Sequence, residues 1–503
     1  MKFIDYVQLN PFQRAGYKIK NFFVNLPKNF VKFFCMLGRF FKMVFFGIVH
    51  SFANYGKRFV KGDWSTKLSY LVMGTGNIAK GQYIKGLLFL IVEAVYFYFL
   101  AFFGFDFLQK FTTLGEIDGE WVFVPPPIHL KPGDNSLKFL LFGVVTIVAT
   151  IVFLVFYIIN TKSAYKVCQL KKNGEHVPAF REEIKEFLDE KFHITLLSVP
   201  ILLIGIFTIL PLIFMILMAF TNLDHNHKVG AVAADWVGLQ TFAEVFSSKS
   251  IGGGGASASM GHTFLSLTQW TIIWAIFATF LNYIMGMIVA LMINKKGIKL
   301  KALWRTLFVV TVAVPQFVTL LVMNQMLNVN NGAINVVLSY LGMGPIDFLG
   351  GTALTARITV IVVNLWVGIP YTILITSGIL MNIPADLYES ATIDGAGPFK
   401  SFMKITLPYM LFVTTPYLIT TFINNINNFN VIYLLSGGGP KTTELYQAGE
   451  TDLLVTWLFK LTMDSQDYNY AAAIGILVFI VCASLSLITF NLTKSAKDEE
   501  AFS

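Results

Sequence analysis

Long apolar stretches alternate with short polar connections along the chain, and this pattern predicts its architecture. Eight stretches are long enough, at roughly 20 residues or more, to cross a lipid bilayer as helices. We expect spans at about 84–105, 137–159, 194–221, 263–294, 305–328, 357–381, 409–434 and 471–493. Helices satisfy their own backbone hydrogen bonds inside lipid. The pattern therefore predicts an all-α, polytopic membrane protein with about eight transmembrane helices.

Composition and charge agree with a membrane protein. Of the 503 residues, 55% are hydrophobic and only 13% are charged, and the mean hydropathy is +0.64. A net charge of +9 could indicate a nucleic-acid partner, but 29 of the 38 Lys and Arg residues fall in segments that the eight spans place on one side. Positive residues gather on the cytoplasmic side of membrane proteins. We therefore expect no nucleic acid, and a multi-pass plasma-membrane protein with both termini cytoplasmic.

The pattern divides the chain into four parts. Residues 1–62 are basic and rich in phenylalanine, which is typical of an amphipathic helix at the cytoplasmic membrane surface, while an extra span near 30–50 is the alternative. Two spans with a cytoplasmic linker, the core and a cytoplasmic tail follow at 63–193, 194–493 and 494–503. The outer loop 222–262 contains a run of glycines and predicts a flexible connector.

Five asparagines within seven residues make the seventh span unusual. Polar side chains in a span usually face protein or a water-filled cavity. On a continuous helix, one arc would gather an aromatic ring, a hydroxyl and three amides: Tyr417, Thr421, Asn424, Asn425 and Asn428. Amides both donate to and accept from sugar hydroxyls, so this arc suits a neutral sugar. Hydrogen bonding between helices is the alternative, and it is the role expected of Asn427 and Asn430.

The sixth span contains the sequence WVGIPY, residues 366–371. Gly368 and Pro370 together predict a kink that frees backbone groups. Breaks of this kind often line the pathway of a transporter, although a kink that serves only packing is the alternative.

The polar connection 384–408 predicts two short helices joined at a glycine corner. Pro384 suits the first turn of a helix, and Asp394-Gly395 is a signal that ends one. The order Glu389-Ser390-Ala391, three residues, Gly395, nine residues, Ile405-x-Leu407-Pro408 is similar to the EAA loop of ABC-importer permeases, with Ser390 in place of the usual Ala.

This loop and four further segments resemble the larger permease subunit of maltose/maltodextrin ABC importers. The other segments are WVGIPY, NNINNF, GGGP at 437–440 and the outer loop AGETDLLVTW. The resemblance covers about 194–493, and the first two spans more weakly. It implies a type I ABC-importer permease fold. It also implies a second EAA-containing permease, an ABC ATPase dimer, an extracellular lipoprotein that binds sugar, and an oligosaccharide substrate.

The resemblance also implies roles for individual residues. The implied sugar contacts are Val367, Gly368, Tyr371, Thr421, Asn425 and Asn428, joined by Asn424 at a position where the maltose permease has a phenylalanine that stacks on sugar. The implied ATPase-coupling residues are Glu389, Ser390, Ala391, Asp394 and Gly395. ATP and Mg would bind to the ATPase partners, so we expect no cofactor in this chain and no enzyme activity of its own. The short 222–262 loop is similar to those of Gram-positive bacterial permeases.

Two other classes of function fit the sequence less well than a sugar importer. An ion-coupled secondary transporter needs ionisable groups within its spans, and among the acidic residues little besides Glu93 falls there. A membrane enzyme needs clustered catalytic side chains, whereas the seven histidines are scattered and the nucleotide-binding pattern G-x4-G-K-[ST] is absent from the sequence. Cys35, Cys168 and Cys482 fit no disulfide or metal spacing, so no metal site is expected.

Overall fold

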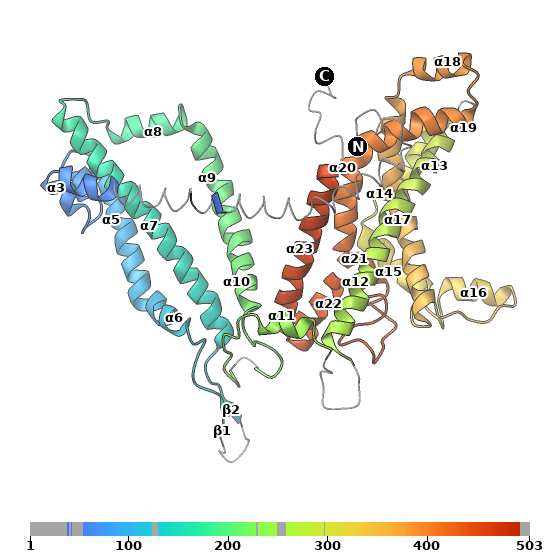
Figure 1. Ribbon diagram of the computed structural model, residues 1–503, viewed down its shortest axis with the longest axis horizontal. Helices are drawn as coiled ribbons and strands as arrows, with labels where there is room; N and C mark the ends of the chain where they lie inside the picture. The colour runs from blue at the N-terminus through green and yellow to red at the C-terminus, as the bar shows by residue number, and fades with distance from the viewer. Residues whose placement is uncertain are drawn as a thin grey trace. The chain divides into compact units, whose positions relative to one another are not determined.

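The computed structural model describes residues 38–39, 42, 54–122, 129–227, 230–248, 258–295 and 297–492, shown in colour in Figure 1. These fall into two units: unit 1 comprises 1–116 and 135–214, and unit 2 comprises 117–134 and 215–503. Most of the predicted amphipathic segment 1–62 and the whole tail 494–503 lie outside the described residues. The domain boundary expected before residue 194 falls within unit 1.

Helices long and apolar enough to cross a membrane confirm the predicted all-α membrane fold. Seven such helices are found in the described part of the chain: Tyr83–Lys110, Ser136–Lys172, Phe192–Met218, Met260–Asn294, Ala353–Met381, Pro398–Ile426 and Tyr468–Leu487. An eighth span results if the bent pair α14 (Lys301–Val312) and α15 (Gln316–Met326) counts as one. This pair bends by 86° immediately before Pro315-Gln316, where proline cannot continue the first helix.

Unit 1 contains the first two spans, most of the third span and a folded polar segment that precedes them. Its helical elements are α3 (Trp64–Leu68), α4 (Thr75–Ile78), α5 (Tyr83–Phe99), the π-helical η1 (Leu100–Gly104), α6 (Phe105–Lys110), α7 (Ser136–Lys172), α8 (Phe180–Leu188), α9 (Phe192–Ile204) and the π-helical η2 (Gly205–Ile209). α10 (Leu210–Met218) carries the chain from unit 1 into unit 2.

Buried polar side chains hold the segment before α5 against α7. Asn160 of α7 is fully buried, donates to the Ser69 carbonyl oxygen at 3.0 Å and accepts from the Gly74 N–H at 2.9 Å. Gly74 has a φ of +84°, and a Cβ there would lie 1.9 Å from the Gly86 carbonyl oxygen. A glycine is therefore required for this close approach of two backbones.

Unit 2 holds the remaining spans and the loops between them. Its elements are β1 (Glu120–Val122), β2 (His129–Lys131), α11 (Gln240–Val245), α12 (Met260–Ile276), η3 (Phe277–Leu281), α13 (Asn282–Asn294), α14, α15, α16 (Ala333–Tyr340), α17 (Ala353–Met381), α18 (Ala385–Ile393), α19 (Pro398–Ser401), η4 (Phe402–Thr406), α20 (Leu407–Ile426), α21 (Phe429–Leu435), α22 (Leu454–Lys460), η5 (Leu461–Ser465) and α23 (Tyr468–Leu492). The short antiparallel β1–β2 pair, with Trp121 opposite Leu130, was not anticipated.

The core of unit 2 is apolar and centres on two tryptophans of α12. Trp270 and Trp274 are buried together with Leu320, Val360 and Ile432, which come from three other helices. Trp274 also donates from Nε1 to the Asn425 carbonyl oxygen at 3.1 Å, so α12 is tied to the end of α20.

The outer connection after α10 has hydrogen-bonded structure where it is described, so the expectation of a flexible connector over 222–262 is wrong for residues 222–227 and 230–248. Thr221 forms an isolated antiparallel bridge with Trp236, and the Thr241 hydroxyl donates to the Thr221 carbonyl oxygen at 3.2 Å. Residues 249–257, which include the glycine run, lie outside the described part of the chain.

Candidate functional site

The connection between α17 and α20 forms the predicted pair of short helices with a glycine corner. α18 ends at Ile393, and Gly395 takes a left-handed φ of +71°. The N–H of Ala396 donates to the Ala391 carbonyl oxygen at 2.9 Å, which closes the end of α18 in the manner of a glycine-containing C-cap. α19 then begins at Pro398.

Most of the predicted coupling residues on this corner are exposed. Glu389, Ser390, Asp394 and Gly395 are exposed, whereas Ala391 is half-buried. In Figure 1 the corner lies at one end of unit 2, beyond the long helices.

Two apolar side chains on the same corner were not identified from the sequence. Ile393 is 87% exposed and Phe399 is 77% exposed, on either side of the Gly395 turn. Large apolar side chains exposed at one end of a protein are candidates for a surface that another protein covers. The available signal was their apolar character inside a connection otherwise rich in polar residues.

A pocket of about 560 Å³ lies where the bent pair α14–α15 meets the kinked helix α17. Its lining comprises Thr311, Val312, Val314, Pro315, Gln316, Thr319, Trp366, Val367, Gly368, Pro370 and Tyr371. This volume falls in the range of about 300–1,000 Å³ that is usual for small-ligand sites. Three of the seven predicted sugar contacts, Val367, Gly368 and Tyr371, therefore share one pocket. Gln316, Thr311 and Thr319 add polar groups that sequence reasoning missed.

Gly368 allows another helix to pack directly behind the pocket wall. A Cβ at this position would lie 2.5 Å from Nδ2 of Asn282, the first residue of α13. The Asn282 Nδ2 donates to the Ala278 carbonyl oxygen at 2.8 Å, while its buried Oδ1 has no partner among the described residues. Gly368 is therefore a close-packing position as well as a lining residue.

The seventh span departs from the predicted arc, because α20 ends at Ile426 and a separate helix α21 starts at Phe429. The break falls at Asn427 and Asn428, and the Asn428 side chain accepts from the Val431 N–H at 3.3 Å. Asparagine is a favourable N-cap residue, and its local bond competes with continuation of the helix. The assumption of one continuous helix over 409–434 is therefore wrong.

The remaining predicted sugar contacts do not line the pocket beside Tyr371. Asn425 is buried, and its Nδ2 donates to the Thr279 hydroxyl at 2.9 Å. Asn428 donates from Nδ2 to the Asn425 Oδ1 at 3.3 Å. Thr421 is half-buried and Asn424 is exposed. The structure thus brings three predicted residues together in one pocket and ties two others into bonds between helices.

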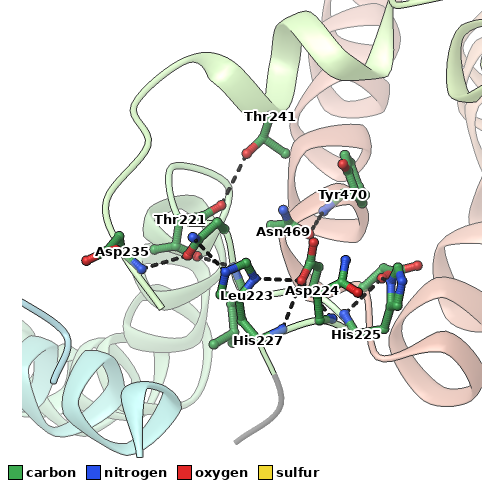
Figure 2. Close-up of polar contacts among 12 residues, drawn as sticks. Thr221, Leu223, Asp224, His225, His227, Asp235, Thr241, Asn469 and Tyr470 are labelled. Carbon is green, nitrogen blue, oxygen red and sulfur yellow. Dashed lines mark hydrogen bonds and ion pairs between the residues drawn. The ribbon is translucent and has the colours of Figure 1, made fainter. Parts of the chain in front are cut away.

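A second polar cluster, drawn in Figure 2, lies at the opposite end of unit 2 from the glycine corner. Asp467 is fully buried, and its carboxylate lies 2.7 Å from the His225 Nδ1 and accepts from the Tyr446 hydroxyl at 2.8 Å. Burial and then this bond to Asp467 raise the pKa of Tyr446. Nearby, the His227 Nδ1 lies 2.8 Å from the Asp224 carboxylate.

This cluster fastens the outer connection to the start of α23. The Asn469 N–H also donates to the Leu223 carbonyl oxygen at 3.1 Å, and the Tyr470 hydroxyl donates to Glu244 at 2.7 Å. In the described part of the chain, no group of three or more His, Cys, Asp or Glu side chains is arranged to hold a metal ion. The cluster has the geometry of a structural fastening.

Comparison with known proteins gives consistent results. Residues 282–497 match the family described as binding-protein-dependent transport system inner membrane component. The galactooligosaccharides transport system permease of Bacillus subtilis (strain 168) is 35% identical over 431 residues, covering 85% of this chain and 97% of the relative. The maltodextrin transport system permease of Streptococcus pneumoniae serotype 4 (strain ATCC BAA-334 / TIGR4) is 34% identical over 432 residues, covering 84% and 94%.

A solved structure supports the fold. The bacterial alginate ABC transporter in complex with alginate pentasaccharide-bound periplasmic protein contains a chain that matches with a TM-score of 0.50 and 21% identity. The match covers 62% of this chain and 96% of that chain. At this identity the likeness concerns the arrangement of helices alone.

Proposed function

Because the chain belongs to the binding-protein-dependent transport system inner membrane components, as a permease of a sugar ABC importer, we propose that it imports maltodextrin-type oligosaccharides and takes its energy from a separate ATPase. The proposed coupling of ATP hydrolysis to transport rests on the structure of the corner 384–408. Its exposed Ile393 and Phe399 flank the left-handed Gly395, and the surrounding residues follow the EAA pattern. A rigid, exposed corner with apolar side chains suits docking into another subunit.

The pocket between α15 and α17 is the proposed sugar site. Tyr371 is 52% exposed and provides a ring that can cover the apolar face of a sugar. Gln316 provides an amide that both donates and accepts. Relatives whose printed names refer to maltodextrin and to galactooligosaccharides support a neutral oligosaccharide as the substrate class.

The proposal includes the partners and placement that the sequence led us to expect. A second EAA-containing permease would complete the pathway, an ATPase dimer would bind ATP and Mg, and an extracellular lipoprotein would deliver the sugar. Both termini would lie in the cytoplasm, which puts the corner 384–408 on the ATPase side and the Asp467 cluster on the side of the binding protein.

The test is reconstitution of the complete complex in lipid nanodiscs and in vesicles. We expect ATP hydrolysis to rise only when binding protein and maltodextrin are both present, and vesicle uptake to persist after ionophores collapse ion gradients. Uptake that follows an ion gradient without ATP would overturn the proposal in favour of a secondary transporter. A response restricted to galactooligosaccharides in a panel of sugars would overturn the maltodextrin assignment alone.

A docking variant tests the corner itself. We expect Ile393→Ser/Phe399→Ser to assemble poorly with the ATPase dimer, because the apolar surface it would cover is replaced by hydroxyls. Leu341→Ser is the control, since Leu341 is also highly exposed but follows α16, away from the corner. Equal recovery of the ATPase with both variants would remove the corner from the interface.

A further inference from the structure

Unit 1 contains a basic pocket that the sugar-import function does not use. The pocket has a volume of about 420 Å³ and is lined by Asn54, Lys57, Arg58, Lys61, Lys162 and Tyr165. Lys57, Arg58 and Lys61 come from one turn of the helical residues 54–61, and Lys162 comes from α7. Four cationic side chains thus surround a single hollow.

None of these four cations forms an ion pair with an acidic side chain in the part of the chain that the structure describes. Arg58 donates from Nε to the Asn54 carbonyl oxygen at 3.1 Å, but its Nη1 is buried and has no described partner. Leaving a buried donor unsatisfied is destabilising, and more so for a charged group. An anion in the pocket would remove this cost and the repulsion between the cations.

Hydrogen bonds outside the pocket hold its walls in place, so the shape of the pocket is defined by the fold. The hydroxyls of Tyr55 and Tyr157 lie 3.0 Å apart, and the Tyr157 hydroxyl donates to the Tyr70 carbonyl oxygen at 2.7 Å. The Tyr70 hydroxyl in turn donates to the Tyr55 carbonyl oxygen at 3.1 Å. These bonds fix the helical residues 54–61 against α7. Lys172 also donates to the Lys61 carbonyl oxygen at 3.2 Å, which adds a further positive charge beside Lys61.

We infer that this pocket binds a phosphate group, whose oxygens accept from the Arg58 guanidinium and from the lysine ammonium groups. Guanidinium groups match phosphate with paired donors, and lysines add point charges. The same chemistry is offered by the headgroup of an anionic phospholipid and by a free phosphate. Val60 and Trp64, 74% and 77% exposed, lie on the same segment, and α7 is a membrane span. Exposed apolar and aromatic side chains beside cations are typical of the lipid interface and favour the headgroup.

The experiment measures binding to the full-length, delipidated protein in detergent by native mass spectrometry. The probes are phosphatidylglycerol, phosphatidylcholine and inorganic phosphate, each added separately. We expect phosphatidylglycerol to bind about tenfold more tightly than phosphatidylcholine, as expected of charge-assisted contacts. A wild-type protein that shows no such preference and retains no inorganic phosphate would overturn the inference, whatever the variants do.

Variants then locate the site. We expect Arg58→Gln/Lys162→Gln to lose about tenfold more affinity for phosphatidylglycerol than Lys166→Gln/Lys171→Gln, which removes the same charge from exposed positions on α7 outside the pocket. Arg58→Lys keeps the positive charge but lacks the paired N–H donors of the guanidinium, so it should retain an intermediate affinity for phosphatidylglycerol. Pocket-dependent binding of inorganic phosphate in place of lipid would assign the site to free phosphate. Equal losses of phosphatidylglycerol affinity in the two double variants would overturn the inference that this pocket is the binding site.

Discussion

The Tyr388 hydroxyl lies 2.8 Å from the Thr406 hydroxyl, and this contact joins the first helix of the corner 384–408 to the base of the seventh span. Thr406 is buried, so its hydroxyl depends on a partner within the protein. The orientation of α18 relative to the span is therefore fixed by a side-chain bond in addition to the chain itself.

Removing this bond should loosen the corner without unfolding it. We expect Tyr388→Phe to insert normally but to lower sugar-stimulated ATP hydrolysis several-fold, because α18 can then pivot at Gly395. Steady-state ATPase assays of the reconstituted complex measure the effect. Tyr340→Phe, at a highly exposed tyrosine on α16, should leave the rate unchanged. A wild-type rate for Tyr388→Phe would show that the bond plays no part in coupling.

Substitution at Gly395 should impair ATPase stimulation more than substitution at Gly397, although both glycines lie in the same corner. Gly395 has a φ of +71°, where a β-branched residue is strained by about 1–2 kcal/mol, whereas Gly397 has an ordinary φ of −68°. We expect Gly395→Val to abolish stimulation of the ATPase, and Gly397→Val to reduce it only slightly. A Cβ at either glycine meets no atom within 4 Å, so a difference between these matched variants reports the backbone conformation of Gly395. Equal ATPase stimulation in the two variants would show that the left-handed conformation of Gly395 is not needed for coupling.

The pocket at the α14–α15 bend predicts a sugar contact on α15. Gln316 lines it and Gln325 does not, although both lie on the same helix. A lost hydrogen bond to an uncharged ligand costs about 0.5–1.5 kcal/mol, so Gln316→Ala should weaken uptake several-fold. Gln325→Ala should transport normally in the same vesicle assay. Matching uptake curves for the two variants would place the sugar elsewhere.

Asn425 and Asn424 should respond differently to the same change. Asn425→Leu leaves the Thr279 hydroxyl without its partner in a buried position, and such losses cost about 1–3 kcal/mol. We expect a lower thermal unfolding midpoint in detergent for Asn425→Leu, and little change for Asn424→Leu, where the side chain is exposed. Unchanged stability of Asn425→Leu would mean that the Thr279 bond is dispensable and would favour a ligand role.

Acid should destabilise the polar segment of unit 1. Burial raises the pKa of the Asp63 carboxyl, but hydrogen bonds from Thr66 and from Lys80 outweigh it and hold that pKa well below its usual range. The native state binds this proton less readily than the unfolded chain, so the carboxylate stabilises unit 1 above the ordinary Asp pKa of about 4 and the stabilisation is lost as the pH falls. The protection factors of the amides in residues 63–86, which correct for the pH dependence of intrinsic exchange, should therefore fall below about pH 4.

A variant that removes the negative charge of Asp63 provides the control for that experiment. Asp63→Asn should exchange faster than wild type at neutral pH, because Lys80 loses its ion pair at 3.1 Å. It should also show a weaker dependence on pH over the acid range. Parallel pH profiles for the two proteins would rule out Asp63 as the titrating group.

The sequence predicted the spans well because lipid imposes one simple requirement, a long apolar helix. It also predicted the corner at Gly395, since proline and glycine act locally. The break at Asn427 was missed because amide side chains suit both a ligand arc and a helix cap, and the choice depends on neighbours that are distant in sequence. The bend before Gln316 had a signal, Pro315, inside a stretch whose length and hydropathy alone predicted one straight span.

The exposure of Ile393 and the burial of Asn282 lay beyond sequence reasoning for a different reason. Isoleucine is among the residue types most often buried, and an asparagine within a span can face protein or a water-filled cavity. Only the packing of α13 against α17, with Gly368 at the contact, decides where Asn282 points. Both residues therefore needed tertiary structure to be recognised.

The segment Pro398–Ile426 is one continuous helix of 29 residues, which at 1.5 Å per residue is about 43 Å long. Its two ends are the glycine corner and the break at Asn427, so a small tilt at one end would become sideways travel at the other, as in a lever. A tilt of only about 5° would carry the far end through about 4 Å, more than the width of a water molecule. Such a lever would open or close a path for a hydroxylated ligand while every helix keeps its own hydrogen bonds.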